Sequence, residues 1–246
     1  MSEKIKYKIL VDSTLCINKD WFESIPSFIE GKPDTNNPNI DIKGKKTAYL
    51  SFDGVLETMN VNPKDKTIIF TNPTSVSSQF NSYNQLNDNN NILILEGTTF
   101  IVAPEKIKDI LEQDLSFKEL KDKVDKLNKS IKFVGFIVDV SELAPNGRIN
   151  SAFKYLIKTT NIKIRLKWSE GKWNKDKISL NIMKLIKDSL TDNITFICLD
   201  KDYPPVKKII EKIYKFNPDI KINFQKMTNG MGSHSGRGFI TIYQNK

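Results

Sequence analysis

Short apolar runs alternate with amphipathic segments along most of the chain. We expect strands at residues 6–11, 47–52, 67–70, 91–95, 132–140, 193–199, 220–224 and 239–243. Apolar residues at helical spacing predict helices over residues 18–29, 80–86, 104–111, 117–131, 151–157, 178–190 and 205–216. We also expect a loop over residues 31–46, a turn at Asp53-Gly54, and a hairpin in which Glu170-Gly171 joins residues 161–168 to 173–175. This alternation indicates a layered α/β architecture, which we divide into two α/β domains at residues 1–130 and 131–246.

The composition is that of an ordinary globular protein. Of the 246 residues, 39% are hydrophobic and 27% are charged, which excludes a disordered chain. The formal net charge of +9 would suit nucleic acid or an anionic membrane surface as a partner. However, all but three of the 38 basic residues are lysines, and they are scattered along the sequence. We therefore interpret the charge as a solvated surface and do not expect a nucleic-acid partner.

The sequence shows no sign of export or of a metal site. No apolar run approaches the roughly 18 residues of a membrane-spanning helix. The first residues do not have the pattern of a signal peptide. The two cysteines, Cys16 and Cys198, do not have the spacing of a metal site or a disulfide framework. We therefore expect a cytoplasmic protein with reduced thiols and no metal.

Polar residues follow two of the predicted strands. Asp12, Ser13 and Thr14 come directly after the first run, at the sheet edge where open α/β proteins bind ligands. The same residues could instead cap the start of the next helix. Residues 71–78 carry more hydroxyl groups than helix capping requires, among them those of Thr74 and Ser75. This surplus indicates a polar site.

A glycine-rich segment precedes the last predicted strand. The segment Gly232-Ser233-His234-Ser235-Gly236-Arg237-Gly238 holds the only histidine of the chain and one of its three arginines. Glycines let backbone N–H groups approach a ligand closely, and the Ser, His and Arg side chains add donors. An anion-binding loop and a plain turn into an edge strand both fit this composition.

Four stretches match, in order, the motifs of one protein family. Asp12-Ser13-Thr14 matches Asp-Ser-(Thr/Ser/Ala), and residues 74–78, which follow Asp53-Gly54, are similar to Thr-Ser-Gln-Pro-Ser. Residues 146–149 are similar to Gly-Gly-Arg-Ile, and residues 232–236 to Gly-Thr-His-Thr-Gly. On these motifs the chain resembles the DegV family, the bacterial fatty-acid-binding proteins, over most of its length.

The resemblance implies two α/β domains with a ligand tunnel between them, which buries the tail of a long-chain fatty acid. Burial of the acyl chain at roughly 0.8 kcal/mol per CH₂ contributes on the order of 10 kcal/mol before costs. The carboxylate must then be hydrogen-bonded, and the family pattern assigns it to His234, with Thr74 or Ser75 as hydroxyl donors. The site loops, which would also contact a phosphate or the kinase, comprise Asp12, Ser13, Thr14, Gly147, Arg148, Gly232, Ser233, Ser235, Gly236 and Arg237.

In this family a separate kinase phosphorylates the bound acid to an acyl phosphate. The resemblance therefore implies a non-catalytic binding protein that presents the carboxylate and needs no cofactor. The chain accordingly has no Gly-x-x-x-x-Gly-Lys-(Ser/Thr) nucleotide motif.

The chain departs from the family pattern in several places, among them Asn146, which stands where the family has the first glycine of Gly-Gly-Arg-Ile. The motif Ser-Ser-x-Leu-Ser-Gly-Thr, whose serine is an expected head-group ligand, is absent, and the run 91–95 leads directly into Glu96-Gly97. Ser77 and Arg237 stand where the family has prolines. Arg237 adds positive charge beside His234 and would favour the phosphorylated ligand. The chain therefore resembles a shortened and divergent member.

Two alternatives remain open on the sequence. A degenerate DegV-like protein with a regulatory or nucleic-acid-binding role would carry no lipid, and its nucleic-acid affinity would fall steeply with salt. A hydrolase would use Ser13 or Ser235 with His234, but no carboxylate that could orient the histidine is evident nearby in the sequence.

Overall fold

The computed structural model describes residues 5–15, 19–34, 47–139 and 162–244, except for the side chain of His234. These residues form two compact units, the first built mainly from residues up to 131 and the second mainly from residue 132 onward. The helix expected over residues 151–157 lies outside the described residues, as do Gly147 and Arg148. No helix in the described part of the chain has the length and apolar character needed to span a membrane.

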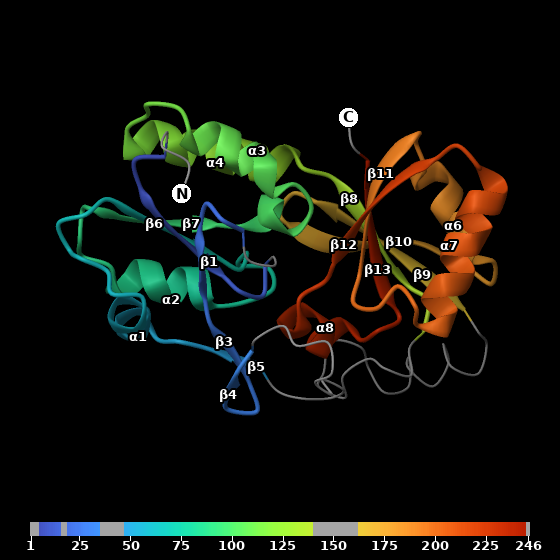
Figure 1. Cartoon of the computed structure of the whole chain (residues 1–246), viewed down its shortest axis with the longest axis horizontal. Coiled ribbons are helices and arrows are strands. Elements are labelled where there is room, and N and C mark those ends of the chain that lie inside the picture. The colour runs from blue at the N-terminus through green and yellow to red at the C-terminus, as the bar shows by residue number, and fades with distance from the viewer. Residues whose placement is uncertain (1–4, 16–18, 35–46, 140–161, 245–246) are drawn as a thin grey trace. The chain divides into compact units, whose positions relative to one another are not determined.

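A four-stranded parallel sheet with the order β2-β1-β6-β7 forms the centre of the first unit (Figure 1). Its strands are β1 (Lys8–Asp12), β2 (Glu23–Ile25), β6 (Thr67–Thr71) and β7 (Ile92–Glu96). Helices cover both faces, as Figure 1 shows: α1 (Phe52–Thr58) and α2 (Gln79–Leu86) on one, α3 (Pro104–Leu111) and α4 (Phe117–Ser130) on the other. A strand covered on both faces has no solvated side, which explains why all five residues of β6 are buried.

Two short segments complete the first unit. A small antiparallel sheet with the order β4-β3-β5 consists of β3 (Ser27–Ile29), β4 (Lys32–Pro33) and β5 (Thr47–Tyr49). The 3₁₀ helix η1 (Thr98–Ile101) follows β7 and contributes the fully buried Phe100. The ring of Phe100 packs against those of Trp21, Phe22 and Phe70, and this aromatic cluster forms part of the core.

The second unit contains a six-stranded mixed sheet with the order β10-β9-β8-β13-β11-β12. Its strands are β8 (Phe133–Ile137), β9 (Lys163–Ser169), β10 (Lys172–Ser179), β11 (Asn193–Cys198), β12 (Lys221–Lys226) and β13 (Phe239–Gln244). Strands β11 and β12 are parallel, whereas β8 is antiparallel to both β9 and β13, and β13 to β11. The hairpin predicted at Glu170-Gly171 is confirmed, and both residues have positive φ, as a two-residue type I′ turn requires.

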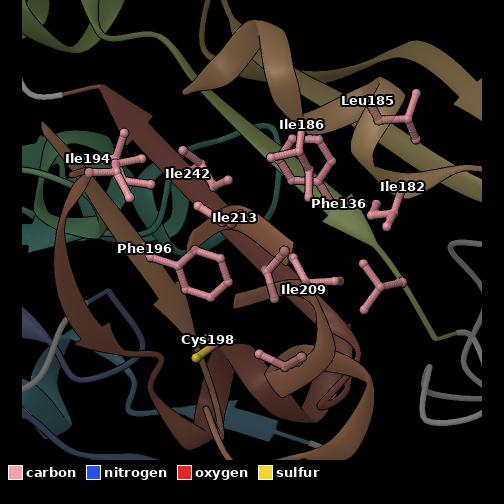
Figure 2. Close-up of a cluster of buried hydrophobic side chains, with 14 residues drawn as sticks. Phe136, Ile182, Leu185, Ile186, Ile194, Phe196, Cys198, Ile209, Ile213 and Ile242 are labelled. Carbon is pink, nitrogen blue, oxygen red and sulfur yellow. The ribbon is translucent and has the colours of Figure 1, made fainter. Parts of the chain in front are cut away.

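Apolar side chains from β8, β11 and β13 pack against α6 (Ile182–Ile186) and α7 (Pro204–Phe216), as Figure 2 shows. Helix α7 begins at two prolines, which lack the N–H groups that remain unpaired at a helix start. It buries Val206, Ile209 and Ile213, whose spacing places them on one face. The predicted α/β fold is confirmed in both units.

Four aromatic rings pack on the opposite face of this sheet around Gly135 of β8. They belong to Phe133, Trp168, Trp173 and Phe239, with neighbouring ring centroids 5.2–5.8 Å apart. A Cβ at Gly135 would lie 2.6 Å from Cζ of Phe239 and 3.0 Å from Cη2 of Trp173. The absence of a side chain at this position therefore lets the rings close over the strand.

The helix predicted over residues 18–29 is wrong. The structure has β2 and β3 there, separated by Pro26. Proline in a helix interior removes a hydrogen bond and clashes with the preceding turn, at a cost of about 3 kcal/mol. Two strand pairings satisfy the backbone instead, because β2 lies parallel to β1 and β3 lies antiparallel to β5.

Two smaller predictions are also wrong. Asp53-Gly54 is not a turn but lies in α1, which Ser51 caps by accepting a hydrogen bond from the N–H of Gly54. The helix expected over residues 178–190 begins later, because β10 continues to Ser179 and Asn181 caps α6.

We expect Gly135→Ala to destabilise the protein by about 1–3 kcal/mol, because the new methyl group would force the surrounding rings apart. Chemical denaturation measures this change in the free energy of unfolding. The matched test repeats the substitution in a Phe239→Leu background, where the clashing ring atoms are gone and the cost should shrink. An equal cost in both backgrounds would show that the ring contact is not its cause.

Candidate functional site

The carboxylate of Asp12 lies at the carboxyl end of β1 and is only 1% exposed. Its Oδ1 accepts hydrogen bonds from the backbone N–H of Thr14, at 2.8 Å, and from the Thr14 hydroxyl. Its Oδ2 accepts a hydrogen bond from Nε2 of Gln79 at 2.6 Å. Both oxygens of this buried carboxylate are therefore paired, as burial of a charged group requires.

The donors of Asp12 are themselves held by a wider network. Oε1 of Gln79 accepts the backbone N–H of Asn72 at 3.1 Å, and Nδ2 of Asn72 donates to the Thr14 hydroxyl at 2.7 Å. Nε2 of Gln79 also donates to the Tyr83 hydroxyl at 3.2 Å, which in turn donates to the carbonyl of Leu50 at 2.7 Å. The network thus joins the ends of β1 and β6 to the start of α2 and to the segment before α1.

Burial and hydrogen bonding act on the Asp12 pKa in opposite directions. Burial raises the pKa because it disfavours the charged form, whereas the hydrogen bonds from Thr14, Gln79 and Asn72 lower it. Burial is the larger effect, so the pKa lies above its ordinary value. Burial also raises the pKa of Tyr83, which keeps this hydroxyl protonated and able to donate to Leu50.

The hydroxyl of Ser13, a residue that the sequence places in the same site, forms its hydrogen bonds within the protein. It donates to Oγ of Ser27 at 2.8 Å and accepts the Ser27 backbone N–H at 2.9 Å. Ser13 is 4% exposed. Its hydroxyl therefore holds β3 beside the end of β1, and both it and the Asp12 carboxylate make their hydrogen bonds within the protein.

Thr74 and Ser75 differ from Asp12 and Ser13. Both are exposed, on the segment between β6 and α2. Within the described part of the chain, neither hydroxyl has a hydrogen-bond partner. The backbone N–H of Thr74, in contrast, donates to Oε1 of Glu96 at 2.7 Å. In the first unit, these two hydroxyls are thus the predicted donors that stay available to a ligand.

The glycine-rich segment of the second unit is mostly helical, so the predicted loop is wrong for Gly232, Ser233, His234 and Ser235. These residues belong to α8 (Asn229–Ser235), which Thr228 caps by accepting the N–H of Met231. The cap supplies the hydrogen bond that allows a glycine-containing segment to start a helix.

The helix α8 ends at Gly236, where φ is +72°, a conformation that favours glycine. Arg237 follows and is exposed at the turn into β13. A Cβ at Gly238 would meet the carbonyl of Asp139, so the chain has no room for a side chain there. The glycines at 236 and 238 are thus explained by backbone geometry and close packing.

The serines of α8 bond to their own helix. The hydroxyl of Ser233 donates to the carbonyl of Gly230 at 2.8 Å, and that of Ser235 donates to the carbonyl of Met231 at 3.0 Å. A serine nucleophile must instead donate its proton to a general base. Ser13 donates to a serine hydroxyl and Ser235 to a backbone carbonyl, so the geometry does not favour a hydrolase built on either.

The arrangement offers hydrogen-bond donors rather than reactive groups. No cluster of His, Cys, Asp and Glu side chains among the described residues could hold a metal ion. Burial raises the pKa of the Cys198 thiol to about 12, which suppresses its reactive thiolate form. What the predicted site residues of the first unit offer a ligand are therefore hydrogen-bond donors, the exposed hydroxyls of Thr74 and Ser75.

Sequence reasoning missed Asn72, Gln79, Tyr83 and Glu96. Asn72 directly follows β6, as Ser13 follows β1, so its place at the same sheet edge was a usable signal. Gln79 and Tyr83 lie one turn apart on α2, but no local pattern shows that the Tyr83 hydroxyl pairs with Gln79. No local pattern pairs Glu96 with Thr74, because the contact depends on the alignment of β6 with β7.

The two units have the fold of the DegV family of fatty-acid-binding proteins, so the predicted resemblance is confirmed at the level of fold. One such structure is a DegV family protein from Eubacterium eligens loaded with heptadecanoic acid, with a TM-score of 0.70, 15% identity, and coverage of 98% of this chain and 100% of that one. Another is the fatty acid kinase (Fak) B3 protein of Streptococcus pneumoniae loaded with linoleic acid, with a TM-score of 0.64, 19% identity and the same coverage.

A third similar structure shows fatty-acid binding by a DegV family protein from Thermus thermophilus, with a TM-score of 0.69, 15% identity, and coverage of 98% of this chain and 100% of that one. No protein-family model matches the chain, and no curated protein matches its sequence. At these identities, the similarity establishes the fold.

We expect substitutions of Asp12 and Gln79 to be coupled in their effect on the free energy of unfolding. Asp12→Asn should destabilise the protein by about 1–3 kcal/mol, because either orientation of the new amide sets an NH₂ group against an existing donor. Gln79→Glu should cost at least as much, because it sets two carboxylates together. The double variant restores an amide donor facing a carboxylate acceptor, so chemical denaturation should show a coupling of about 1 kcal/mol or more. Additive losses would mean that the contact between Asp12 and Gln79 does not organise this edge.

Proposed function

We propose that this chain binds a long-chain fatty acid and presents its carboxylate to a separate kinase, which phosphorylates it to an acyl phosphate. The observation that carries this proposal is the fold: 98% of the chain aligns with the whole of two structures loaded with heptadecanoic and linoleic acid. The similarity therefore extends over both compact units and not over one shared domain.

The exposed segment between β6 and α2 supports the proposal with chemistry. A fatty-acid carboxylate is an acceptor, and the free hydroxyls of Thr74 and Ser75 are donors. The network of Asp12, Asn72 and Gln79 holds both ends of this segment, so the hydroxyls would be ordered before the ligand arrives. Such preorganisation reduces the entropy lost on binding.

His234 is the expected charge-assisted donor. A bound carboxylate would favour the protonated imidazole, and a hydrogen bond between two charged groups is stronger than one between neutral groups. The predicted role of His234 comes from the resemblance, and its position in the sequence of α8 places it one residue from the hydroxyls of Ser233 and Ser235. Those hydroxyls are bonded within the helix, which leaves the histidine as the candidate ligand of that segment.

One solved structure with the same fold supports the kinase step. The Streptococcus pneumoniae structure is the B3 protein of a fatty acid kinase, and it shares the fold over its whole length. In the proposed reaction, a carboxylate oxygen attacks the terminal phosphorus of a nucleoside triphosphate held by the kinase. The nucleoside diphosphate leaves, and the acyl phosphate stays with this chain. This chain would bind and orient the fatty acid, and the exposed Arg237 would add positive charge for the phosphorylated ligand.

Mass spectrometry of lipids extracted from the purified protein tests the binding. We expect a long-chain fatty acid in the wild type, and about ten- to a hundredfold weaker fatty-acid affinity in His234→Ala, because a charge-assisted hydrogen bond is lost. Thr74→Ala combined with Ser75→Ala should also weaken binding. Ser82→Ala, which removes a hydroxyl from α2, is the control and should bind as the wild type does. A wild-type protein that is empty and has no fatty-acid affinity would refute the proposal.

The role of Arg237 is tested with the phosphorylated ligand. Arg237→Ala should lower the affinity for an acyl phosphate more than the affinity for the fatty acid, because the phosphate carries more negative charge. Arg237→Lys keeps the charge and should retain most of the difference. Titration of both ligands into the three proteins measures these ratios. Equal acyl-phosphate affinities in the wild type and Arg237→Ala would show that Arg237 does not contribute to binding.

A further inference from the structure

We propose that Glu96 is the positioning residue of the head-group site: its carboxylate holds the Thr74 backbone in place, and its charge limits the affinity for an anionic head group. The inference rests on the proposed function, since it assigns the ligand to the Thr74 and Ser75 hydroxyls. The observation behind it is the hydrogen bond from the N–H of Thr74 to Oε1 of Glu96, at 2.7 Å.

This hydrogen bond links residues 73–75, which carry the two hydroxyls, to the end of β7. For residues 73–75, it is the one described hydrogen bond that reaches outside residues 72–79. The carbonyl of Pro73 is paired locally, since the N–H groups of Val76 and Ser77 both donate to it. Between the two ends that the Asp12 network holds, the Thr74 backbone therefore depends on Glu96 for its position relative to the sheet.

Glu96 can hold the segment because its own backbone is fixed. It is the last residue of β7, and its register partner is Thr71, the last residue of β6. Its carbonyl accepts a hydrogen bond at 2.6 Å from Nδ2 of the buried Asn128 on α4. Oδ1 of Asn128 in turn accepts bonds from the N–H and the hydroxyl of Thr99, at 3.1 and 2.8 Å.

The residue after Glu96 is equally constrained. The N–H of Gly97 donates to the carbonyl of Thr71 at 2.8 Å. A Cβ at Gly97 would collide with the side chain of the buried Leu15, so this strand end lies tightly against the core. Glu96 thus projects its carboxylate from a rigid base toward an exposed segment.

The same carboxylate has a second effect on a ligand. It occupies the Thr74 N–H, so a head group at this position would bond to the hydroxyls. Two hydrogen-bond lengths and the separation of N and Oγ within Thr74 put a ligand oxygen at the Thr74 hydroxyl at most about 9 Å from Oε1 of Glu96, which is comparable to the screening length of about 8 Å in physiological salt. Repulsion would then lower the affinity for a carboxylate and leave a neutral head group unaffected.

Two substitutions separate the positioning role from the charge. Glu96→Gln keeps an oxygen that can accept the Thr74 N–H but removes the charge. Glu96→Ala removes both. Glu57→Gln removes one negative charge from an exposed position on α1 and serves as the control for net charge.

The experiment titrates a long-chain fatty acid and the fatty alcohol of the same length into the four proteins. Glu96→Gln should bind the acid about two- to fivefold more tightly than the wild type, the size expected for exposed charges, and the alcohol equally. Glu96→Ala should bind both ligands more weakly than Glu96→Gln, because the hydroxyls are no longer held. Glu57→Gln should match the wild type with both ligands.

Hydrogen exchange of the Thr74 amide, measured without ligand, completes the test. Exchange should be faster in Glu96→Ala than in the wild type and should remain slow in Glu96→Gln. If the wild type binds the acid but all variants match it in affinity and exchange, the inference fails and the proposed function stands. If the wild type binds no fatty acid, the proposed function fails, and the exchange rates alone decide whether Glu96 holds Thr74. Equal exchange in all four proteins would then overturn the positioning role as well.

Discussion

The buried carboxylate of Asp12 is the constraint on which the candidate site depends. An unpaired charge inside a protein is costly, so the surrounding chain must supply donors. Thr14 and Gln79 supply them, and Asn72 and Tyr83 hold Thr14 and Gln79 in turn. Satisfying one carboxylate therefore fixes the ends of two parallel strands and the start of α2. The segment that carries Thr74 and Ser75 is held between these fixed points.

This constraint separates residues whose polar groups are paired within the protein from residues whose hydroxyls are exposed. Asp12 and Ser13 resemble ligand-binding residues in the sequence, but their oxygens are paired within the protein. Thr74 and Ser75 lie on the same edge of the unit, with exposed and unpaired hydroxyls in the described structure. Glu96 takes the Thr74 N–H and leaves the hydroxyls. The two exposed hydroxyls thus lie on a segment that buried polar contacts hold at both ends.

The sequence predicted the fold well where the signal is local. Strands such as β6 and β7 are continuous apolar runs, and the apolar spacing of α7 matches its buried face. The prediction failed at residues 18–29, where aromatic residues at helical spacing outweighed the evidence of Pro26. It also failed in the glycine-rich segment, where the Thr228 cap and tertiary packing produce a helix despite the low helix propensity of glycine.

The candidate site was predicted less completely than the fold. Motif resemblance selected two segments that the fold brings to one place, since Asp12 and Thr74 both lie at the carboxyl edge of the parallel sheet. It could not tell which of their polar groups are already paired, because Gln79 and Glu96 reach them only through strand register and helix placement. A hydrogen-bond partner distant in the sequence leaves no local pattern. The distinction between structural and ligand-facing groups therefore needs the folded chain.

The most direct test of the account is a crystal structure of the protein with a long-chain fatty acid bound. We expect the carboxylate to lie within hydrogen-bond distance, about 2.6–3.2 Å, of the Thr74 or Ser75 hydroxyl, with the Asp12 network unchanged. A carboxylate bound instead by Ser13 and Thr14, with the contact between Asp12 and Gln79 broken, would contradict the division between structural and ligand-facing residues. A chain that binds no fatty acid even at saturating concentration would contradict the proposed function itself.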